Sequence, residues 1–168
     1  KYVYVNCWSY QNRILKIDTE TDKVVDELVV GIQPTSLVMD CNNKLWTVTD
    51  GGYEGSPYGH EAPSLYRIDA ETFTIEKRFV FEYGDWPSEV QLNGTKDKIY
   101  WLNDDVWEMD VTANHIPSTP FLPYDNTLYY GLTICPRTGD VYIADAIDYV
   151  QPGMVYRYSK DRELLDSF

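Results

Sequence analysis

Short runs of alternating large apolar and polar residues recur along the chain, and none has the apolar spacing of an amphipathic helix. Four of these runs share a five-residue pattern that ends in a small polar residue: Tyr-Val-Tyr-Val-Asn at 2–6, Leu-Trp-Thr-Val-Thr at 45–49, Ile-Tyr-Trp-Leu-Asn at 99–103 and Val-Tyr-Ile-Ala-Asp at 141–145. A second run of the same kind follows each of them, at 14–18, 65–69, 106–110 and 155–159. The pattern predicts pairs of β-strands throughout the chain.

Successive repeats lie about 42 to 54 residues apart, which is the period of a four-stranded propeller blade and too long for a leucine-rich or helical repeat. The sequence therefore predicts an all-β fold, a β-propeller of four-stranded antiparallel blades with about four blades present. The expected blades cover approximately residues 1–30, 34–81, 87–122 and 129–168. Residues 1–168 as a whole then form one partial β-propeller.

The first and third blades depart from this pattern. The chain opens directly on the run at 2–6, so the first blade should lack an inner strand and have three strands. The outer strand expected in the third blade, near 117–122, matches the strand pattern poorly. We expect the four blades to be part of a larger, seven-bladed ring, with closure of the four blades on themselves as the alternative.

The aligned runs also predict which side chains are equivalent, because side chains alternate across a strand. The residues expected at one structural position are Trp46, Tyr100, Tyr142 and Val3, with Leu45, Ile99, Val141 and Tyr2 on the opposite side of their sheets. Asp18 and Asp69 stand at the same place in successive blades, each at the start of a turn. Their carboxylates should accept hydrogen bonds from the backbone two residues further on.

Composition and charge exclude several classes of partner and structure. The net charge of -13 works against binding to phosphate backbones, so we expect no nucleic-acid partner. No apolar run approaches the length of a transmembrane segment, and none is expected. Cys7, Cys41 and Cys135 are too few and too irregular for a disulfide framework, so we expect three unpaired thiols.

The long loops of the predicted blades should emerge on one face, opposite the short turns. These loops are rich in aromatic and acidic residues, and large amphipathic rings on loops are typical of recognition surfaces. The alternative for any single ring is that it packs loop against loop. The residues expected to bind a ligand on this face are Trp8, Tyr10, Asp50, Tyr53, Tyr58, His60, Asp85, Trp86, Tyr124, Asp145 and Tyr149.

The segment from Asp50 to Ser64 is the strongest single candidate within this face. Its four glycines, two prolines, two tyrosines and one histidine describe a shaped but mobile arm that closes over a ligand. His60 alone does not make a metal site, because the chain contains only two histidines. We therefore expect no metal at the arm.

Catalysis has little support in the sequence. Asp50, Asp104 and Asp145 follow equivalent strands, and in propeller hydrolases such carboxylates hold a divalent ion in the central channel. A repeated turn also requires Asn or Asp at these places, and this explanation is the simpler one. No nucleophile elbow, phosphate loop or zinc-binding histidine pair is present. We expect no catalytic residues and no cofactor.

Two stretches resemble known families. The stretch Val-Gly-Ile-Gln-Pro-Thr-Ser at 30–36, together with Ile-Asp-Thr-Glu-Thr at 17–21, resembles the YncE-like seven-bladed propellers. The stretch from Val141 to Tyr158 is similar to the surface propeller lipoproteins of gut bacteria that include the cobalamin-capturing BtuG group. The second resemblance implies capture of cobalamin or a related corrinoid, and its delivery to an outer-membrane transporter.

We therefore expect a non-enzymatic ligand-capture protein, extracytoplasmic and attached as a lipoprotein to the outer membrane at the cell surface. Cobalamin is the leading ligand, since it is large and its amide-decorated rim suits aromatic and polar loops. A propeller scaffold that binds glycans or proteins remains an alternative, because exposed tryptophans and carboxylates serve glycans equally well. A calcium-dependent lactonase-like hydrolase is a further alternative, and it requires a metal in the channel.

Overall fold

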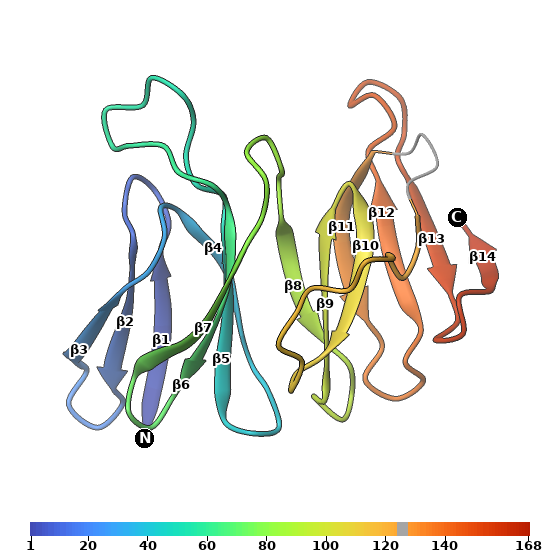
Figure 1. Ribbon diagram of the computed structural model, residues 1–168. Coiled ribbons are helices and arrows are strands. Elements are labelled where there is room, and N and C mark those ends of the chain that lie inside the picture. Colours follow the sequence, from blue (N-terminus) through green and yellow to red (C-terminus); the bar gives the residue numbers. More distant parts are fainter. Residues whose placement is uncertain (124–127) are drawn as a thin grey trace. The chain divides into compact units, whose positions relative to one another are not determined.

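The computed structural model describes residues 1–123 and 128–168, which form β-strands, turns and loops with no helix among them (Figure 1). The chain divides into two compact units, Lys1–Ser88 and Glu89–Phe168. In the described residues no helix could cross a membrane. Each unit holds two antiparallel sheets whose strands follow one another in sequence order.

The first unit contains a three-stranded and a four-stranded sheet. The first sheet has the order β1-β2-β3, with β1 at Tyr2–Cys7, β2 at Arg13–Asp18 and β3 at Lys23–Val29. The second sheet has the order β4-β5-β6-β7, with β4 at Pro34–Met39, β5 at Lys44–Thr49, β6 at Ser64–Asp69 and β7 at Thr74–Val80. The prediction of three strands in the first sheet is confirmed.

The sheets of the second unit are likewise three- and four-stranded. The third sheet joins β8 at Ser88–Leu92, β9 at Lys98–Asn103 and β10 at Asp105–Asp110. The fourth joins β11 at Tyr129–Ile134, β12 at Val141–Asp145, β13 at Met154–Tyr158 and β14 at Leu164–Ser167.

The outer strand expected near 117–122 is absent. Contact with the sheet is limited to an isolated bridge between Leu122 and Val106, near the start of β10, and a hydrogen bond of 2.8 Å from the Phe121 N–H to the Val106 carbonyl. Pro117 and Pro120 lie in this segment, and proline cannot donate a hydrogen bond to a strand ladder. The prediction of a fourth strand here is wrong for that reason.

Strand pairing corrects the predicted equivalence of side chains in the first sheet. Tyr4, and not Val3, occupies the position of Trp46. Tyr4 pairs with a residue two positions before the turn aspartate of its sheet, and Trp46 does the same in the second sheet. The equivalent pairs are Tyr4 with Lys16, Trp46 with Arg67, Tyr100 with Glu108, and Tyr142 with Arg157. The prediction was wrong by one residue because the run at 2–6 alternates Tyr and Val, so a shift of one still matches large apolar residues with each other.

The two faces of every sheet can now be defined. Face B of a sheet carries the aromatic position of Tyr4 and its equivalents, and face A carries the residue before it, Val3 and its equivalents. In the first unit, Tyr4, Ile14 and Leu28 on face B of the first sheet pack in one apolar cluster with face A of the second sheet. The face A residues in this cluster include Leu37, Met39, Leu45, Tyr66 and Ile68.

The second unit repeats this packing. Tyr100, Leu102 and Val106 lie on face B of the third sheet. They share one apolar cluster with Leu132, Ile134, Val141 and Ile143, which lie on face A of the fourth sheet. Face B of one sheet therefore covers face A of the following sheet in both units.

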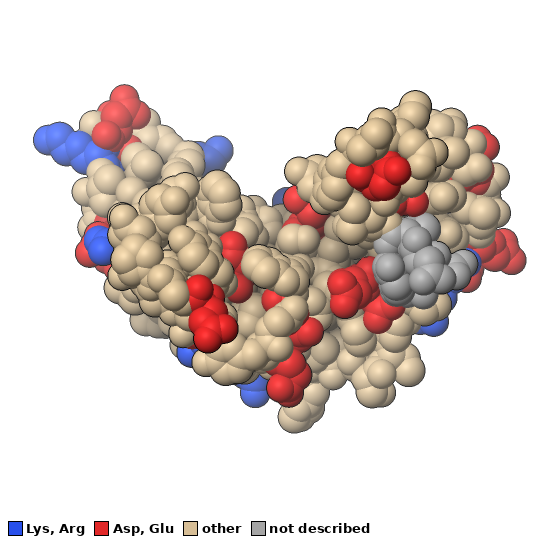
Figure 2. All heavy atoms as spheres, turned by 90° about the horizontal axis from the view of Figure 1, so that it is seen from above, with Lys and Arg blue, Asp and Glu red and all other residues tan. Residues whose placement is uncertain are grey.

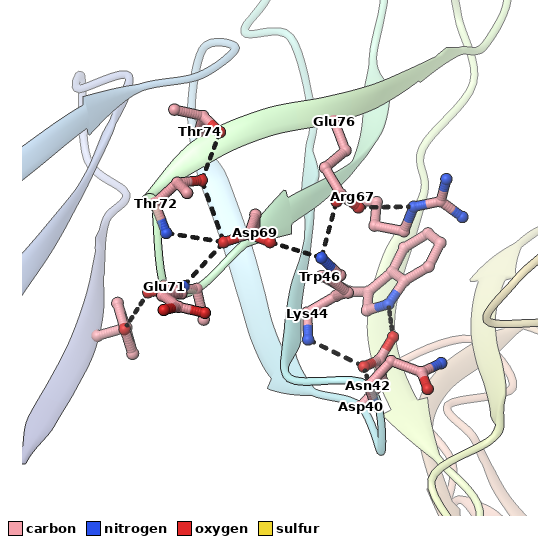
Figure 3. A network of polar contacts seen from close by, with 12 residues as sticks. Asp40, Asn42, Lys44, Trp46, Arg67, Asp69, Glu71, Thr72, Thr74 and Glu76 are labelled. Carbon is pink, nitrogen blue, oxygen red and sulfur yellow. Dashed lines mark hydrogen bonds and ion pairs between the residues drawn. The ribbon is translucent and has the colours of Figure 1, made fainter.

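Short turns close the end of the second sheet opposite its long loops, and polar contacts hold them (Figure 3). Asp40 accepts hydrogen bonds from the backbone N–H groups of Asn42 and Lys44, at 2.8 and 2.9 Å. Its other carboxylate oxygen accepts the Trp46 Nε1–H at 2.8 Å. This single side chain thus ties the β4–β5 turn to the largest buried ring of the sheet.

Asp69 holds the next turn in the predicted way. Its Oδ1 accepts the N–H groups of Glu71 and Thr72 at 2.9 and 2.7 Å, and the Lys44 Nζ donates to its Oδ2 at 2.5 Å (Figure 3). Asp18 makes the same turn contacts with Glu20. The predicted role of both aspartates is confirmed.

A pH dependence of folding follows from Asp69. The Lys44 ammonium and the Thr72 N–H lower the pKa of this carboxyl well below its usual range. A lowered pKa contributes stability that is present above about pH 4 and is lost as the pH falls further. We expect Asp69→Asn to reduce the free energy of unfolding at pH 7 and to change it much less at pH 2. Urea titrations at both values measure this, and an equal loss at both would contradict it.

Candidate functional site

Four connections leave the strands of the first unit at the end opposite the short turns (Figure 1). They are the β1–β2 loop, the β3–β4 link, the long β5–β6 loop and the β7–β8 link. The view onto the loop ends shows exposed acidic side chains among uncharged residues (Figure 2). The predicted division into a long-loop end and a short-turn end holds for this unit.

The β5–β6 loop is an arm whose root is closed by backbone contacts. The Gly51 N–H donates to the Ile32 carbonyl at 3.1 Å, and the Glu61 N–H donates to the Gly51 carbonyl at 2.9 Å. An isolated antiparallel bridge joins Gly52 to His60. Gly51 has a φ of 79°, and a Cβ there would lie 2.1 Å from the Glu61 carbonyl oxygen. Only glycine therefore fits at the root of the arm.

Glu61 anchors the arm to its surroundings. Its Oε1 accepts the Ile32 N–H at 2.7 Å, and its Oε2 accepts from the Arg78 guanidinium at 3.2 Å. A Cβ at Gly31 would lie 2.8 Å from this carboxylate, so the backbone of the β3–β4 link approaches it closely. The carboxylate thus connects the arm to the link and to β7.

Asp50 lies where β5 ends and the arm begins. Its Oδ1 accepts the Gly52 N–H at 2.8 Å, and the Trp8 Nε1–H points at its Oδ2 from 3.4 Å. In the amide orientation that gives both the oxygen and the nitrogen of Gln33 suitable partners, the Gln33 nitrogen donates to Asp50 Oδ1 at 2.8 Å. Burial raises the pKa of the Asp50 carboxyl and outweighs the opposing hydrogen bonds from Gly52 and Trp8. Asp50 is therefore a half-buried acceptor that links three loops.

Exposed aromatic rings surround this root. Tyr10 of the β1–β2 loop stacks on Tyr58 of the arm with ring centroids 4.4 Å apart. His60 meets the edge of Tyr83 at 5.3 Å. Trp86 is 63% exposed although it is among the largest apolar side chains of the unit. Rings of this size left in water are typical of binding surfaces.

A recess of about 130 Å³ opens between the arm and the β7–β8 link. Its lining combines aromatic rings with carboxylates: Asp50, Gly52, Tyr53, Glu54, His60, Pro63, Gly84, Asp85 and Trp86. Asp85 is held in place because its Oδ2 accepts the Glu82 N–H at 2.9 Å. The structure thus brings five of the predicted residues into one lining: Asp50, Tyr53, His60, Asp85 and Trp86.

A larger hollow of about 540 Å³ lies at the short-turn end of the same unit. Tyr2, Lys16, Asn43 and Glu71 border it, and none of the predicted binding residues does. The Lys16 ammonium lies 4.5 Å from the centre of the Tyr2 ring. This hollow is larger than the recess, but its lining sets two tyrosine rings beside two lysines and a single carboxylate, whereas three carboxylates line the recess.

Two of the predicted residues that the structure describes belong to the second unit. Asp145 is buried, and its Oδ1 accepts the N–H groups of Leu128 and Ile147 at 2.9 and 2.8 Å. These contacts give it the turn-holding role that the sequence allowed as the alternative. Tyr149 is 68% exposed and meets Tyr130 edge to face at 5.8 Å. Tyr124, also predicted, lies outside the described residues.

The prediction omitted two residues that shape the site. Tyr83 lies in the same link as Trp86 and is 67% exposed, so its position in a long-loop segment was a usable signal. Glu61 gave no such signal, because its role depends on the distant residues Ile32 and Arg78. Among the described residues, no group of three or more His, Cys, Asp or Glu side chains is arranged to hold a metal ion.

Comparisons with known proteins identify the fold. No family model matches the chain, and no curated protein matches it in sequence. Hydrazine synthase from Kuenenia stuttgartiensis is similar in structure, with a TM-score of 0.74 and 15% identity over 99% of this chain and 45% of that one. The Dos1 propeller gives a TM-score of 0.65 and 12% identity over 94% and 39%.

A gluconolactonase from Xanthomonas campestris is a third similar structure, with a TM-score of 0.66 and 14% identity over 94% of this chain and 56% of that one. At these identities the likeness shows the fold alone. The chain spans less than two thirds of the length of each of these proteins. The predicted all-β propeller fold, with antiparallel sheets of three or four strands as blades, is confirmed.

Proposed function

We propose that this β-propeller chain captures a ligand without transforming it, and that the ligand binds at the arm and recess of the first unit. The observation that carries the proposal is the recess itself. It combines exposed rings, Tyr53 and Trp86, with carboxylates of Asp50, Glu54 and Asp85 on a root that backbone contacts hold in place. Such a surface binds by stacking and by accepting hydrogen bonds.

The chemistry of the lining indicates the class of ligand. An ionised carboxylate can accept hydrogen bonds but cannot donate them, so these side chains favour ligand groups that carry N–H or O–H donors. Exposed rings favour a flat apolar surface next to those donors. A corrinoid such as cobalamin has both, with a broad ring and amides around its rim. The recess of about 130 Å³ is smaller than an ordinary small-molecule pocket. It would hold one rim group, while the exposed rings of the loops cover part of the remainder.

The biological setting is part of the proposal. The resemblance of the stretch from Val141 to Tyr158 to surface propeller lipoproteins supports a place on the bacterial outer membrane. In that setting the protein would pass the ligand to an outer-membrane transporter. A strongly acidic protein, with a net charge of -13, would attract a transporter surface that is basic.

Calorimetric titration of the chain with cobalamin tests this proposal. We expect Trp86→Ala to weaken binding by about 2 kcal/mol, which is about thirtyfold in Kd, because exposed aromatic anchors dominate binding energies. Tyr2→Ala is the matched control. Tyr2 is an exposed ring of the same unit, but it lies at the short-turn end. Its replacement should leave the Kd unchanged.

Other results would redirect the assignment. An absence of heat with cobalamin, together with saturable heat from a neutral oligosaccharide that Trp86→Ala weakens, would replace the corrinoid with a glycan at the same recess. Equal loss of binding in Trp86→Ala and Tyr2→Ala would contradict the site. Turnover of a sugar lactone that a chelator stops would overturn the non-enzymatic assignment and favour a hydrolase.

A further inference from the structure

The recess between the arm and the β7–β8 link gathers negative charge. The carboxylates of Asp50, Glu54 and Asp85 line it, and no lysine or arginine is among the described residues of its lining. The two segments that form it, residues 50–63 and 81–87, contain no lysine or arginine in the sequence. In the part of the chain that the structure describes, no ion pair includes any of the three carboxylates. The fold therefore supplies no cation to this recess.

Partly buried carboxylates elsewhere in the same unit are paired with cations. Asp69 lies 2.5 Å from the Lys44 ammonium, and Glu61 lies 3.2 Å from the Arg78 guanidinium. In the recess, Asp50 accepts hydrogen bonds from neutral groups only. Burial raises the pKa of the Asp50 carboxyl, because its charge is removed from water without a positive partner. A cation carried by a ligand would provide that partner.

Aromatic rings stand beside these carboxylates. Tyr53 and Trp86 line the recess and are 52% and 63% exposed. The face of such a ring attracts a cation, and tryptophan does so most strongly. Among residues 1–123 and 128–168, no three His, Cys, Asp or Glu side chains converge on one point as metal ligands do. The carboxylates are instead spread around the recess. This arrangement suits a cation whose charge is distributed over several atoms.

We propose that the recess binds the ammonium group of a small organic molecule. The inference rests on the proposed function for the location of the ligand, and it adds the charge of the group that enters the recess. A volume of about 130 Å³ suits a small head group and not a whole ligand. The rest of the molecule would extend over the exposed rings of the loops.

Calorimetric titration with choline at about 0.15 M salt tests this inference, because choline carries a compact quaternary ammonium. The matched ligand is the neutral alcohol in which a carbon atom replaces the nitrogen of choline, since it has the same shape without the charge. We expect choline to give saturable heat and the neutral alcohol to bind at least about tenfold more weakly. Glu54→Gln, Asp85→Asn and Trp86→Ala should each raise the Kd for choline at least about threefold.

Glu82→Gln is the matched control variant. Glu82 is exposed on the same link as Asp85, but it does not line the recess. The substitution removes the same charge as Glu54→Gln and keeps the backbone N–H that donates to Asp85. Because salt screens charges outside the recess, the Kd for choline should change less than about twofold. Circular dichroism verifies that all variants are folded.

The inference is overturned if choline gives no saturable heat, if the neutral alcohol binds equally well, or if Glu82→Gln weakens binding as much as Glu54→Gln does. A parallel titration with cobalamin separates it from the proposed function. Binding of cobalamin that depends on Trp86, without binding of choline, would remove the ammonium group alone. Binding of choline with the expected variant pattern, without heat from cobalamin, would support the ammonium group and remove the corrinoid.

Discussion

Replacing Trp46 with alanine should lower the free energy of unfolding by about 3 to 5 kcal/mol. Trp46 is fully buried, stacks on Phe79 at a centroid distance of 6.0 Å, and has the Arg67 guanidinium 5.7 Å from its ring centre. Its Nε1–H donates to Asp40, which also holds the β4–β5 turn. The substitution therefore opens a cavity and leaves a buried carboxylate oxygen without this donor.

Urea titrations of Trp46→Ala and Trp86→Ala measure this effect against a matched control. Trp86 is 63% exposed, so its removal should change the unfolding free energy by less than about 1 kcal/mol. A second tryptophan variant, Trp46→Phe, should recover part of the loss because it refills part of the cavity. An unchanged midpoint for Trp46→Ala would contradict the buried position of this ring.

The second large effect is expected at the root of the arm. Gly51→Ala should lower the unfolding free energy by about 2 to 4 kcal/mol, combining the strain of a left-handed backbone with a clash against a fixed carbonyl. A Cβ at residue 51 would lie 2.1 Å from the Glu61 carbonyl oxygen. The Glu61 N–H donates to the Gly51 carbonyl. A shift of either backbone segment would break this hydrogen bond and displace the root of the arm.

Gly55→Ala provides the control for this effect. Gly55 also has a positive φ, 83°, but no atom lies within 4 Å of the place of its Cβ. It should therefore show only the backbone strain of about 1 to 2 kcal/mol or less. Hydrogen exchange distinguishes the two variants further, because the Glu61 amide should lose protection in Gly51→Ala and keep it in Gly55→Ala. Equal losses of stability would contradict the close approach at the root.

Local signals were sufficient to predict the strands and turns. The run at 45–49 predicts β5 within one residue, because alternation with Trp and Val is a property of the strand itself. The turn at Asp69 was equally predictable, since its carboxylate bonds to backbone groups only two and three residues away. The aromatic loops were identified as a group because the order of strands in a blade determines at which end each loop emerges.

The site was predictable only in part. Tyr53 and Trp86 could be recognised as exposed rings on long loops, and both line the recess. Asp145 matched the same pattern of a carboxylate after a strand, yet it is buried and holds the backbone of its loop. Exposure and hydrogen bonding distinguish these cases, and both depend on which segments fold back over the residue.

By itself, the sequence determined the repeat, the all-β class, the acidic surface and the identity of the aromatic loops, because each depends on residues close together in the chain. The tertiary structure decided the register of β1, where Tyr4 and not Val3 joins the core, since Tyr and Val alternate and only the packing against Leu45 and Ile68 selects one face. It also decided the role of Glu61, which depends on contacts with Ile32 and Arg78. Side-chain partners distant in sequence leave no local pattern, so only the folded chain reveals them.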